Sequence, residues 1–572
     1  MFFCKLNFYF LSKNRIFAVL KVKNSNVMTN KTTLRDSAAM RWIALLLLAL
    51  AMFCSYVFMD ILSPIKDLMQ STRGWDSEAF GRMQGAEVFL NVYVFFLIFA
   101  GIILDKMGVR FTAVLSGIVM LIGGCIKFYA VSDMFPGTSL EVWFNNHLNW
   151  DGEIPIIGSI FPFVAGMPAS AKLAACGFML FGCGVEMAGI TVSRGIVKWF
   201  KGRETALAMG SEMALARLGV ATCMIFSPYF ANLGGSVHVD NAVKFGVVLL
   251  CIALIMFIVY FFMDKKLDSQ TGEAEEKDDP FKISDLGKIF TSLGFWLVAL
   301  LCVLYYSAIF PFQKYAVNML QCNLTLNPAD PATYWGGSTD AFPVSVTIVQ
   351  YIIMLIVAIC AFASNFSKNK GLKYGLMGLA VIALVCYCYM GYMRGTAETI
   401  FAVFPLLAVA ITPILGNYVD HKGKAASMLM LGSILLVICH LTFAFILPMF
   451  KGDAVGGTVV AYITILVLGA SFSLVPAALW PSVPKLVDEK IIGSAYAAIF
   501  WIQNIGLGLF PALIGIVLTN TNAEGTAAHE LDYTWALVML AALGIAALLI
   551  SIYLKAVDKR KGYGLEEPNI KK

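Results

Sequence analysis

Blocks of about 20 apolar residues recur along the whole chain, and they limit what it can fold into. A helix of that length crosses the roughly 30 Å hydrocarbon core of a bilayer, where backbone polar groups must be satisfied internally. Only 14% of the 572 residues are charged, whereas a soluble protein carries about a quarter. The sequence therefore predicts an all-α, polytopic membrane protein, with the lipid bilayer as a partner.

We place about fourteen spans. They lie near 39–62, 83–105, 111–132, 172–198, 204–232, 242–263, 290–320, 345–366, 373–393, 398–419, 425–449, 458–484, 493–519 and 533–556. The predicted division of the chain is a basic tail (1–38), a first six-helix half (39–263), a polar linker (264–289), a second half (290–556) and a C-terminal tail (557–572).

One loop motif, Gly-x-x-x-Asp-x-x-Gly, occurs twice, each time where an apolar block ends. The first copy places Asp105 before Arg110, and the second places Asp420 before Lys424. A signal repeated in two parts of a membrane protein indicates duplication, and therefore a transporter built from related halves. The alternative is two ordinary tight turns. As conformational latches, both carboxylates would face the positive N-terminal end of a helix.

Basic residues gather in alternate links between the predicted spans. The basic links lie at 106–110, 198–203, 367–373 and 421–424. By contrast, 133–171 and 321–344 contain no Lys or Arg. Because Lys and Arg are retained on the cytoplasmic side, both termini are predicted to be cytoplasmic. Residues 1–38 are interpreted as a basic tail, with Met28 as an alternative start.

The duplicated motif, six spans before a linker and a second set after it resemble the major facilitator superfamily over roughly 39–556. Further matching runs are Trp199-Phe200-Lys201-Gly202-Arg203-Glu204, Met213-Ala-Leu-Ala-Arg217-Leu-Gly219, Tyr305-Tyr306 with Phe310-Pro311-Phe312, Ala478-Leu479-Trp480-Pro481, and Gly493-Ser-Ala-Tyr496 with Ile502-Gln503-Asn504. These runs look like the lysosomal dipeptide-transporter branch of that superfamily. The resemblance implies a 6+6 helix bundle that works by alternating access. It also implies that the partners of the two motif carboxylates are spans 11 and 5 in the numbering of that family.

Two spans depart from this pattern. The segment at about 345–393 is interpreted as an inserted two-helix hairpin, because it preserves the parity of the spans and its tip is basic. The N-terminal tail also lacks an acidic dileucine sorting signal. We therefore expect a microbial relative in the cell membrane, such as a bacterial inner membrane, and we expect a monomer.

An acid and a base lie at equal depth in adjacent spans. Glu186 is 13 residues before Trp199, and Arg217 is 13 residues after Glu204, which places both roughly 20 Å from the same edge. One reading is a structural ion pair. The other is that they separate to receive a zwitterion, the carboxylate meeting an ammonium and the guanidinium a carboxylate. The family resemblance implies these same roles for a dipeptide.

Other polar groups within the spans are candidates for a cavity, for gates or for helix contacts. The cavity candidates are Tyr56, Tyr93, Tyr306, Tyr496, Gln503, Asn504 and Trp480, which could instead be helix–helix contacts or, for Trp480, an interfacial anchor. The gating candidates are Asp60, Asp105, Arg110, Asp420, Lys424 and Arg194. Glu212 carries a proton or neutralises a nearby arginine. Lys127, Lys314 and His440 are weaker candidates.

The leading hypothesis is a secondary transporter of small zwitterions, in particular dipeptides. The alternative is a proton-coupled carrier of organic anions that uses Arg217 and Arg194 on the substrate and Glu212 as the proton site. We find no nucleotide-binding motif, no nucleophile–base set and no Cys/His cluster, so we expect neither an enzyme nor a metal or other cofactor. The net charge of +6 belongs to the predicted cytoplasmic loops and requires no nucleic acid.

Overall fold

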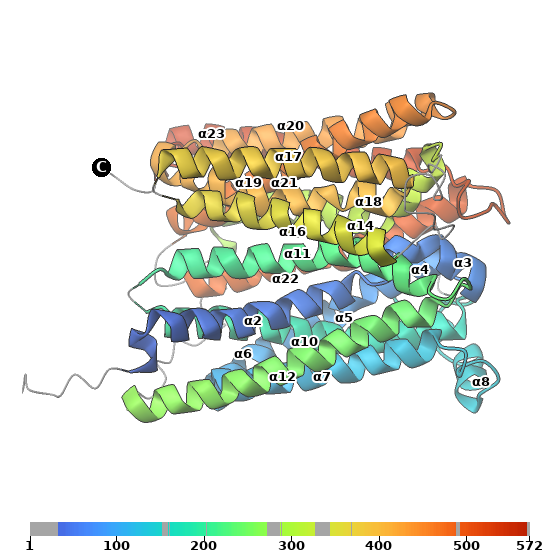
Figure 1. Cartoon of the computed structure of the whole chain (residues 1–572), viewed down its shortest axis with the longest axis horizontal. Helices are drawn as coiled ribbons and strands as arrows, with labels where there is room; N and C mark the ends of the chain where they lie inside the picture. The colour runs from blue at the N-terminus through green and yellow to red at the C-terminus, as the bar shows by residue number, and fades with distance from the viewer. Residues whose placement is uncertain are drawn as a thin grey trace, which may run out of the picture.

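The computed structural model describes residues 33–151, 158, 161–201, 203–271, 287, 289–326, 344–367, 369–487 and 492–568. All regular elements in these ranges are helical, and the long helices run side by side along one axis (Figure 1). Most of the predicted linker lies outside the described residues, although its first part, 264–271, continues the helix before it.

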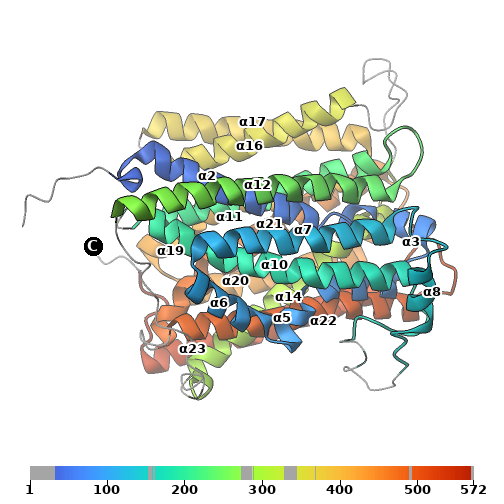
Figure 2. The ribbon, with the colours of Figure 1, turned by 90° about the horizontal axis from the view of Figure 1, so that it is seen from below.

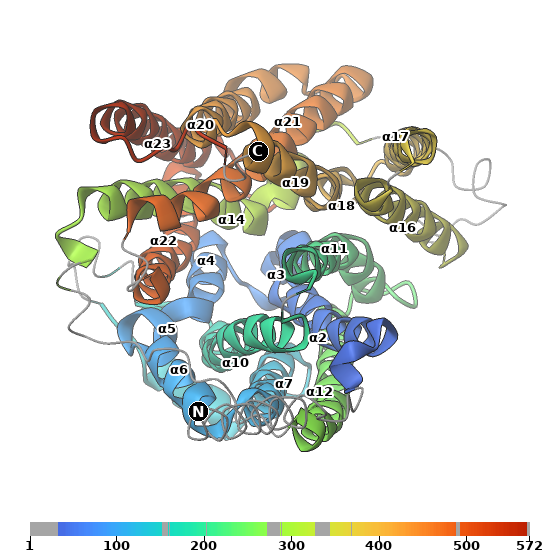
Figure 3. The ribbon, with the colours of Figure 1, turned by 90° about the vertical axis from the view of Figure 1, so that its left-hand side faces the viewer.

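The helices form two groups. The first contains α2 (Ala38–Met59), α3 (Lys66–Arg73), α4 (Ser77–Gly85), α5 (Phe89–Tyr93), α6 (Phe96–Met107), α7 (Val109–Val131), α8 (Ser139–Asn146), α10 (Ala169–Trp199), α11 (Thr205–Ala231) and α12 (Val239–Thr271). The second contains α14 (Leu293–Asn323), α16 (Val344–Phe366), α17 (Lys370–Arg394), α18 (Ala397–Phe401), α19 (Val403–Lys422), α20 (Ala425–Leu441), α21 (Ala454–Leu486), α22 (Ile492–Thr521) and α23 (Thr534–Lys561). Seen along the axis, the groups lie one above the other (Figure 3).

The predicted number of spans is confirmed. Within the described residues, thirteen helices are long and apolar enough to cross a membrane, and a bent pair makes fourteen if it counts as one span. In that pair, Ser77–Tyr93 and Phe96–Met107 meet at 62°. The bend lies at Phe95, which takes a left-handed backbone conformation with φ of 56°, a conformation that L-residues rarely adopt. The second predicted span is therefore broken near its middle.

Both loop motifs lie at the same end of the bundle, which we name the motif end; it is on the left in Figure 1. Each motif turns at its last glycine, since Gly108 and Gly423 have φ of 80° and 73°. Their amides donate to Leu104 O and Val419 O, which closes the preceding helices. We name the other end, which carries α3 and α8 (Figure 2) and also α4 (Figure 1), the opposite end.

The predicted hairpin is the pair α16–α17, at the edge of the second group (Figure 3). Arg394 Nη1 donates to Gln350 Oε1 at 2.6 Å and joins the two helices. On α17, Ile382 and Val385 are 63% and 64% exposed, as expected for side chains that face lipid. The hairpin thus adds to the outside of the bundle, and Tyr351 of α16 also contacts the first group, with its hydroxyl 3.2 Å from Thr222 Oγ1 of α11.

Candidate functional site

A row of polar residues on α14 joins the two groups near the opposite end. Its members are Gln313, Lys314, Asn318 and Gln321, at spacings that place them on one face of a helix. Lys314 Nζ lies 2.7 Å from Asp60 Oδ1, and Gln313 Nε2 donates to Asp60 Oδ2 at 2.7 Å. Asp60, at the C-terminal end of α2, is 1% exposed. The gating candidate Asp60 is therefore held by two residues of the second group.

The same row continues toward the end of the bundle. Lys66 Nζ donates to Asn318 Oδ1 at 3.1 Å. Gln321 Nε2 donates to Asp67 Oδ2 and to Glu398 Oε1, at 3.4 and 3.3 Å. We name these α2–α3 and α14 contacts, together with those of Asp60, the polar interface. Sequence reasoning singled out only Asp60 and, weakly, Lys314; the spacing of the polar residues on α14 was the signal that could have found the others.

Backbone contact seals the opposite end further. A Cβ atom on Gly85 of α4 would lie 2.2 Å from Gly508 O of α22, and one on Gly515 would lie 2.3 Å from Ser77 O. Only glycine allows two helices to approach so closely. The two groups are therefore tightly packed at this end.

Glu186 and Arg217 lie at the centre of the bundle without pairing. Asn504 Nδ2 of α22 donates to Glu186 Oε1 at 3.0 Å, so the acid contacts the second group. The Arg217 guanidinium lies 5.0 Å from the ring centres of both Phe310 and Phe472, again in the second group. Both residues are described, and no ion pair is recorded between them. The structural ion pair is therefore not formed in this conformation.

Aromatic candidates of the second group form one cluster beside this centre. Trp480 Nε1 donates to Tyr306 Oη at 3.2 Å, and Tyr496 Oη donates to Trp480 O at 3.0 Å. The Trp480 ring stacks on Phe500 at 4.7 Å. Trp480 lies on α21, which contains Pro476, Pro481 and Pro484. The structure thus brings Trp480, Tyr306 and Tyr496 together from three helices, and the prolines of the helix that carries Trp480 remove backbone hydrogen bonds.

Three further candidates lie in different surroundings. Tyr56 of α2 stands 5.8 Å from the Arg217 guanidinium and so belongs to the central group. Gln503 is buried and accepts from Cys302 Sγ, a contact within the second group. Tyr93 lies next to the break in its span, is 37% exposed and packs against Phe89 with tilted rings. The structure records no contact between Tyr93 and the other candidates.

The proton-site candidate Glu212 and the weaker candidate His440 also have defined surroundings. Glu212 is half-buried on α11, and its carboxylate interacts electrostatically with Arg217. That Glu212 serves to neutralise an arginine stays a prediction. His440 is fully buried, with Nδ1 3.0 Å from Leu436 O and its ring against Phe312. These are the surroundings of a histidine in a helix core.

At the motif end, Asp105 contacts its own group. Arg194 Nη1 of α10 binds Asp105 Oδ1 at 2.5 Å, while Arg110 Nη1 binds Asp268 Oδ2 at 2.7 Å. Lys198 bridges Asp264 and Asp268, both at 2.7 Å. The expected partner of Asp105, a helix end in the other half, is thus replaced in this conformation by Arg194. This arrangement leaves the latch role of Asp105 as a prediction for another conformation.

The second motif is held by the segment that follows α23. Glu566 accepts through Oε1 from Ser427 N and through Oε2 from Ser427 Oγ, both at 2.8 Å. Its backbone oxygen also accepts from Lys424 N at 3.1 Å. Lys485, at the end of α21, donates to Gly564 O at 2.9 Å. The N-terminus of α20, which follows the second motif, is therefore capped by a carboxylate from the C-terminal segment, and the latch role of Asp420 stays a prediction.

Removing this cap should loosen the start of α20. We expect Glu566→Ala to cost about 1 kcal/mol, as for other lost helix caps, and so to speed amide exchange over 425–428 about fivefold. Hydrogen exchange of the purified protein measures this. Glu567→Ala is the matched control, since Glu567 contributes its backbone oxygen to Lys485. Equal exchange in the two variants would show that Glu566 does not hold the loop.

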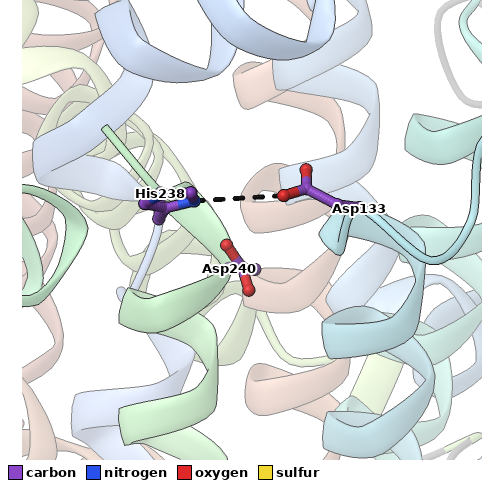
Figure 4. Close-up of side chains that lie close together, drawn as sticks. All are labelled: Asp133, His238 and Asp240. Carbon is purple, nitrogen blue, oxygen red and sulfur yellow. Dashed lines mark ion pairs between the residues drawn. The ribbon is translucent and has the colours of Figure 1, made fainter. Parts of the chain in front are cut away.

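One group of His and Asp side chains among the described residues lies close enough together to hold a metal ion. Asp133, His238 and Asp240 place their ligand atoms within 4.8 Å of one another (Figure 4). However, Arg73 Nη2 already binds Asp133 Oδ1 at 2.5 Å. Because that guanidinium supplies a cation to the cluster, we assign it no metal.

The chain is similar to known proteins both in sequence and in fold. The model of the Major Facilitator Superfamily matches residues 154–399. The lysosomal dipeptide transporter MFSD1 of Bos taurus is 24% identical over 372 residues, 63% of this chain and 62% of the relative. The Danio rerio protein is 26% identical over 64% of this chain and 63% of the relative. The chain thus spans less than two thirds of the length of these relatives.

Solved structures with the same fold include transporters of different solutes. The nucleoside transporter NupG aligns with a TM-score of 0.55 and 11% identity, covering 90% of this chain and 99% of that one. The D-xylose–proton symporter aligns with a TM-score of 0.51 and 13% identity, covering 91% and 97%. At such identities the likeness establishes the fold alone. This chain is a multi-pass membrane protein with the fold of these transporters; part of its sequence matches the model of the major facilitator superfamily, and it resembles the lysosomal dipeptide transporter MFSD1.

Proposed function

We propose that this chain is a secondary transporter that moves small zwitterionic solutes, in first place dipeptides, by alternating access. The observation that carries the proposal is the state of Arg217. Its guanidinium stacks on Phe310 and Phe472, and no hydrogen bond from it to a described residue is recorded. None of its nitrogen atoms is among the buried atoms that lack partners. A guanidinium whose N–H groups remain open suits a bidentate carboxylate ligand.

Glu186 supplies the complementary charge for the other end of a zwitterion. Its carboxylate accepts one hydrogen bond, from Asn504 of the second group. An incoming ammonium would compete with that amide and form a charge-assisted hydrogen bond, which is about twice as strong. Binding would therefore alter a contact between the two groups of helices. The resemblance to proteins described as lysosomal dipeptide transporters supports the same solute class.

We further propose that the motif end faces the cytoplasm, with both termini there, and that the protein resides in a cell membrane. The support is the basic loops of that end, whereas the relatives are described as lysosomal. The sealed opposite end then corresponds to a state that is closed to the outside. An impermeant thiol reagent added to cells should label Glu530→Cys and spare Lys370→Cys, two exposed positions at the two ends; the reverse result would contradict this orientation.

A thermal-shift screen of the purified protein tests the solute class. Free dipeptides should raise the melting temperature, since a ligand at 100 times its Kd stabilises by about 2.7 kcal/mol. Single amino acids and organic acids serve as comparison sets. Stabilisation by organic acids without any by dipeptides would favour the organic-anion carrier. In that carrier Arg194 would also bind the solute, yet here Arg194 is paired with Asp105.

A further inference from the structure

Four charged side chains, of which Glu87 alone is partly exposed, meet where the C-terminal end of α2 faces α14. Lys314 Nζ lies 2.7 Å from Asp60 Oδ1 and 3.9 Å from Glu87 Oε2. Lys127 of α7 is fully buried, and its ammonium lies 3.6 Å above the Phe178 ring. No described group accepts a hydrogen bond from Lys127 Nζ. Two carboxylates and two ammonium groups therefore share one largely buried region.

These four charges are unequally divided between the two groups of helices. Asp60, Glu87 and Lys127 belong to the first group, while only Lys314 belongs to the second. With the opposite end sealed, the four charges sum to zero. When the groups separate at that end, Lys314 leaves with α14, and the first group keeps one uncompensated negative charge. If Lys127 were neutral, the separated first group would keep two uncompensated negative charges. An unpaired charge in such a site costs several kcal/mol.

We propose that Glu87 and Asp60 form a proton-binding site that is loaded when the opposite end opens and is emptied when Lys314 returns. Glu87 is the acceptor, because only the 3.9 Å contact with Lys314 ties its carboxylate to this cluster, whereas Asp60 also keeps its hydrogen bond from Ser63 in the first group. An O–H bond forms on Glu87 with a proton from the solution at the opposite end. The bond breaks when the Lys314 ammonium returns, and the proton leaves toward the motif end.

Other charged groups near Glu87 do not cancel the surplus. Glu186 carries the same charge as Glu87 and repels it. Arg217 and Glu212 interact electrostatically with the neighbouring Tyr56. Glu186 and Arg217 belong to the proposed solute site, where their charges sum to zero. Cys223 of α11 also faces the cluster, as a thiol. The proposal rests on the alternating access proposed above, and not on the identity of the solute.

Opening of the opposite end can be measured without any solute. Ile65 is fully buried beside the polar interface, so Ile65→Cys should react with an impermeant thiol reagent only when that end opens. Its labelling rate is divided by that of the always exposed Glu530→Cys, which removes the effect of pH on thiol reactivity. We expect this ratio to rise as pH falls, by up to about tenfold per pH unit, the limit for one linked proton.

The carboxylate that binds the proton is identified by matched variants in the Ile65→Cys protein. Glu87→Gln should raise the ratio at neutral pH and abolish its pH dependence. Glu87→Asp keeps the charge and should restore the dependence. Glu524→Gln, an exposed carboxylate at the same end, should change nothing. The proposal is overturned if the ratio is independent of pH, if Glu87→Gln keeps the dependence, or if Glu212→Gln alone abolishes it.

Proton movement is then measured in liposomes that contain a trapped pH-sensitive dye. Dipeptide added outside should acidify the lumen, and replacing Na⁺ with choline should make no difference. Glu87→Gln should still exchange dipeptide for dipeptide but lose the acidification at least tenfold. Dipeptide uptake without acidification, or uptake that requires Na⁺, overturns the proton site and leaves the dipeptide function standing. A pH-dependent labelling ratio without any dipeptide movement supports the proton site and contradicts the dipeptide function instead.

Discussion

Glu186→Gln is expected to weaken the binding of free dipeptides by roughly 10- to 100-fold, and of N-acetylated dipeptides far less. The reason is that a hydrogen bond to a charged group contributes about 1.5–3 kcal/mol, and only a free amine carries that charge. Gln keeps the shape of the side chain and can still accept from Asn504, so the contact to α22 survives. Binding of matched free and acetylated dipeptides to the purified variant measures the effect as a ratio of two affinities.

Arg217→Lys provides the complementary test at the other end of the solute. A lysine ammonium is a point charge and cannot form the two parallel hydrogen bonds of a guanidinium. It would also lose the stacking on Phe310 and Phe472. We therefore expect dipeptide binding to fall, whereas dipeptides amidated at the C-terminus should be little affected by the change.

A purely structural role for Glu186 and Arg217 predicts a different result. Both single variants would then unfold more easily, and a Glu186→Arg/Arg217→Glu exchange would restore stability without changing solute preference. Melting temperatures are therefore compared before any affinity is interpreted. An unchanged ratio of free to acetylated dipeptide affinity in stable Glu186→Gln protein would rule out the amine-binding role.

The elements predicted from the sequence are those that depend on local pattern. Apolar blocks of membrane-spanning length appear as helices at the predicted places, including the hairpin α16–α17. The motif glycines Gly108 and Gly423 are required by the positive φ of each turn. Such features are read from neighbouring residues, so no knowledge of how the helices pack was needed.

Partners between the two groups were not predictable in the same way. Gln313 and Asp60 are 253 positions apart, and a hydropathy pattern does not reveal which helix faces will meet. Asp105 was expected to contact the other half, yet Arg194 of its own group binds it. A transporter also moves between conformations, so the partner of a gating residue changes with the state of the protein. The sequence left open whether Glu186 and Arg217 pair or stay apart, because that choice depends on how the helices pack.

Lys314→Met should break the polar interface and lower the stability of this conformation strongly. Met has a similar length but no charge, so Asp60, 1% exposed, would lose its ion pair in a dry site. Removing one partner of a buried pair typically costs about 3–5 kcal/mol. Thermal unfolding of the purified protein should therefore show a large drop. Lys244→Met, at an exposed position of α12, is the matched control and should have little effect.

The double variant Asp60→Asn/Lys314→Met separates the pair from its surroundings. Asn keeps the acceptor for Gln313 and carries no charge, so the double variant should recover much of the stability that Lys314→Met loses. A double-mutant cycle then gives the coupling between the two side chains. If the losses of the single variants simply added, Asp60 and Lys314 would not act as a pair. The opposite end would then be held by the glycine contacts of α4 and α22, and opening it would uncover no charge for a proton to neutralise.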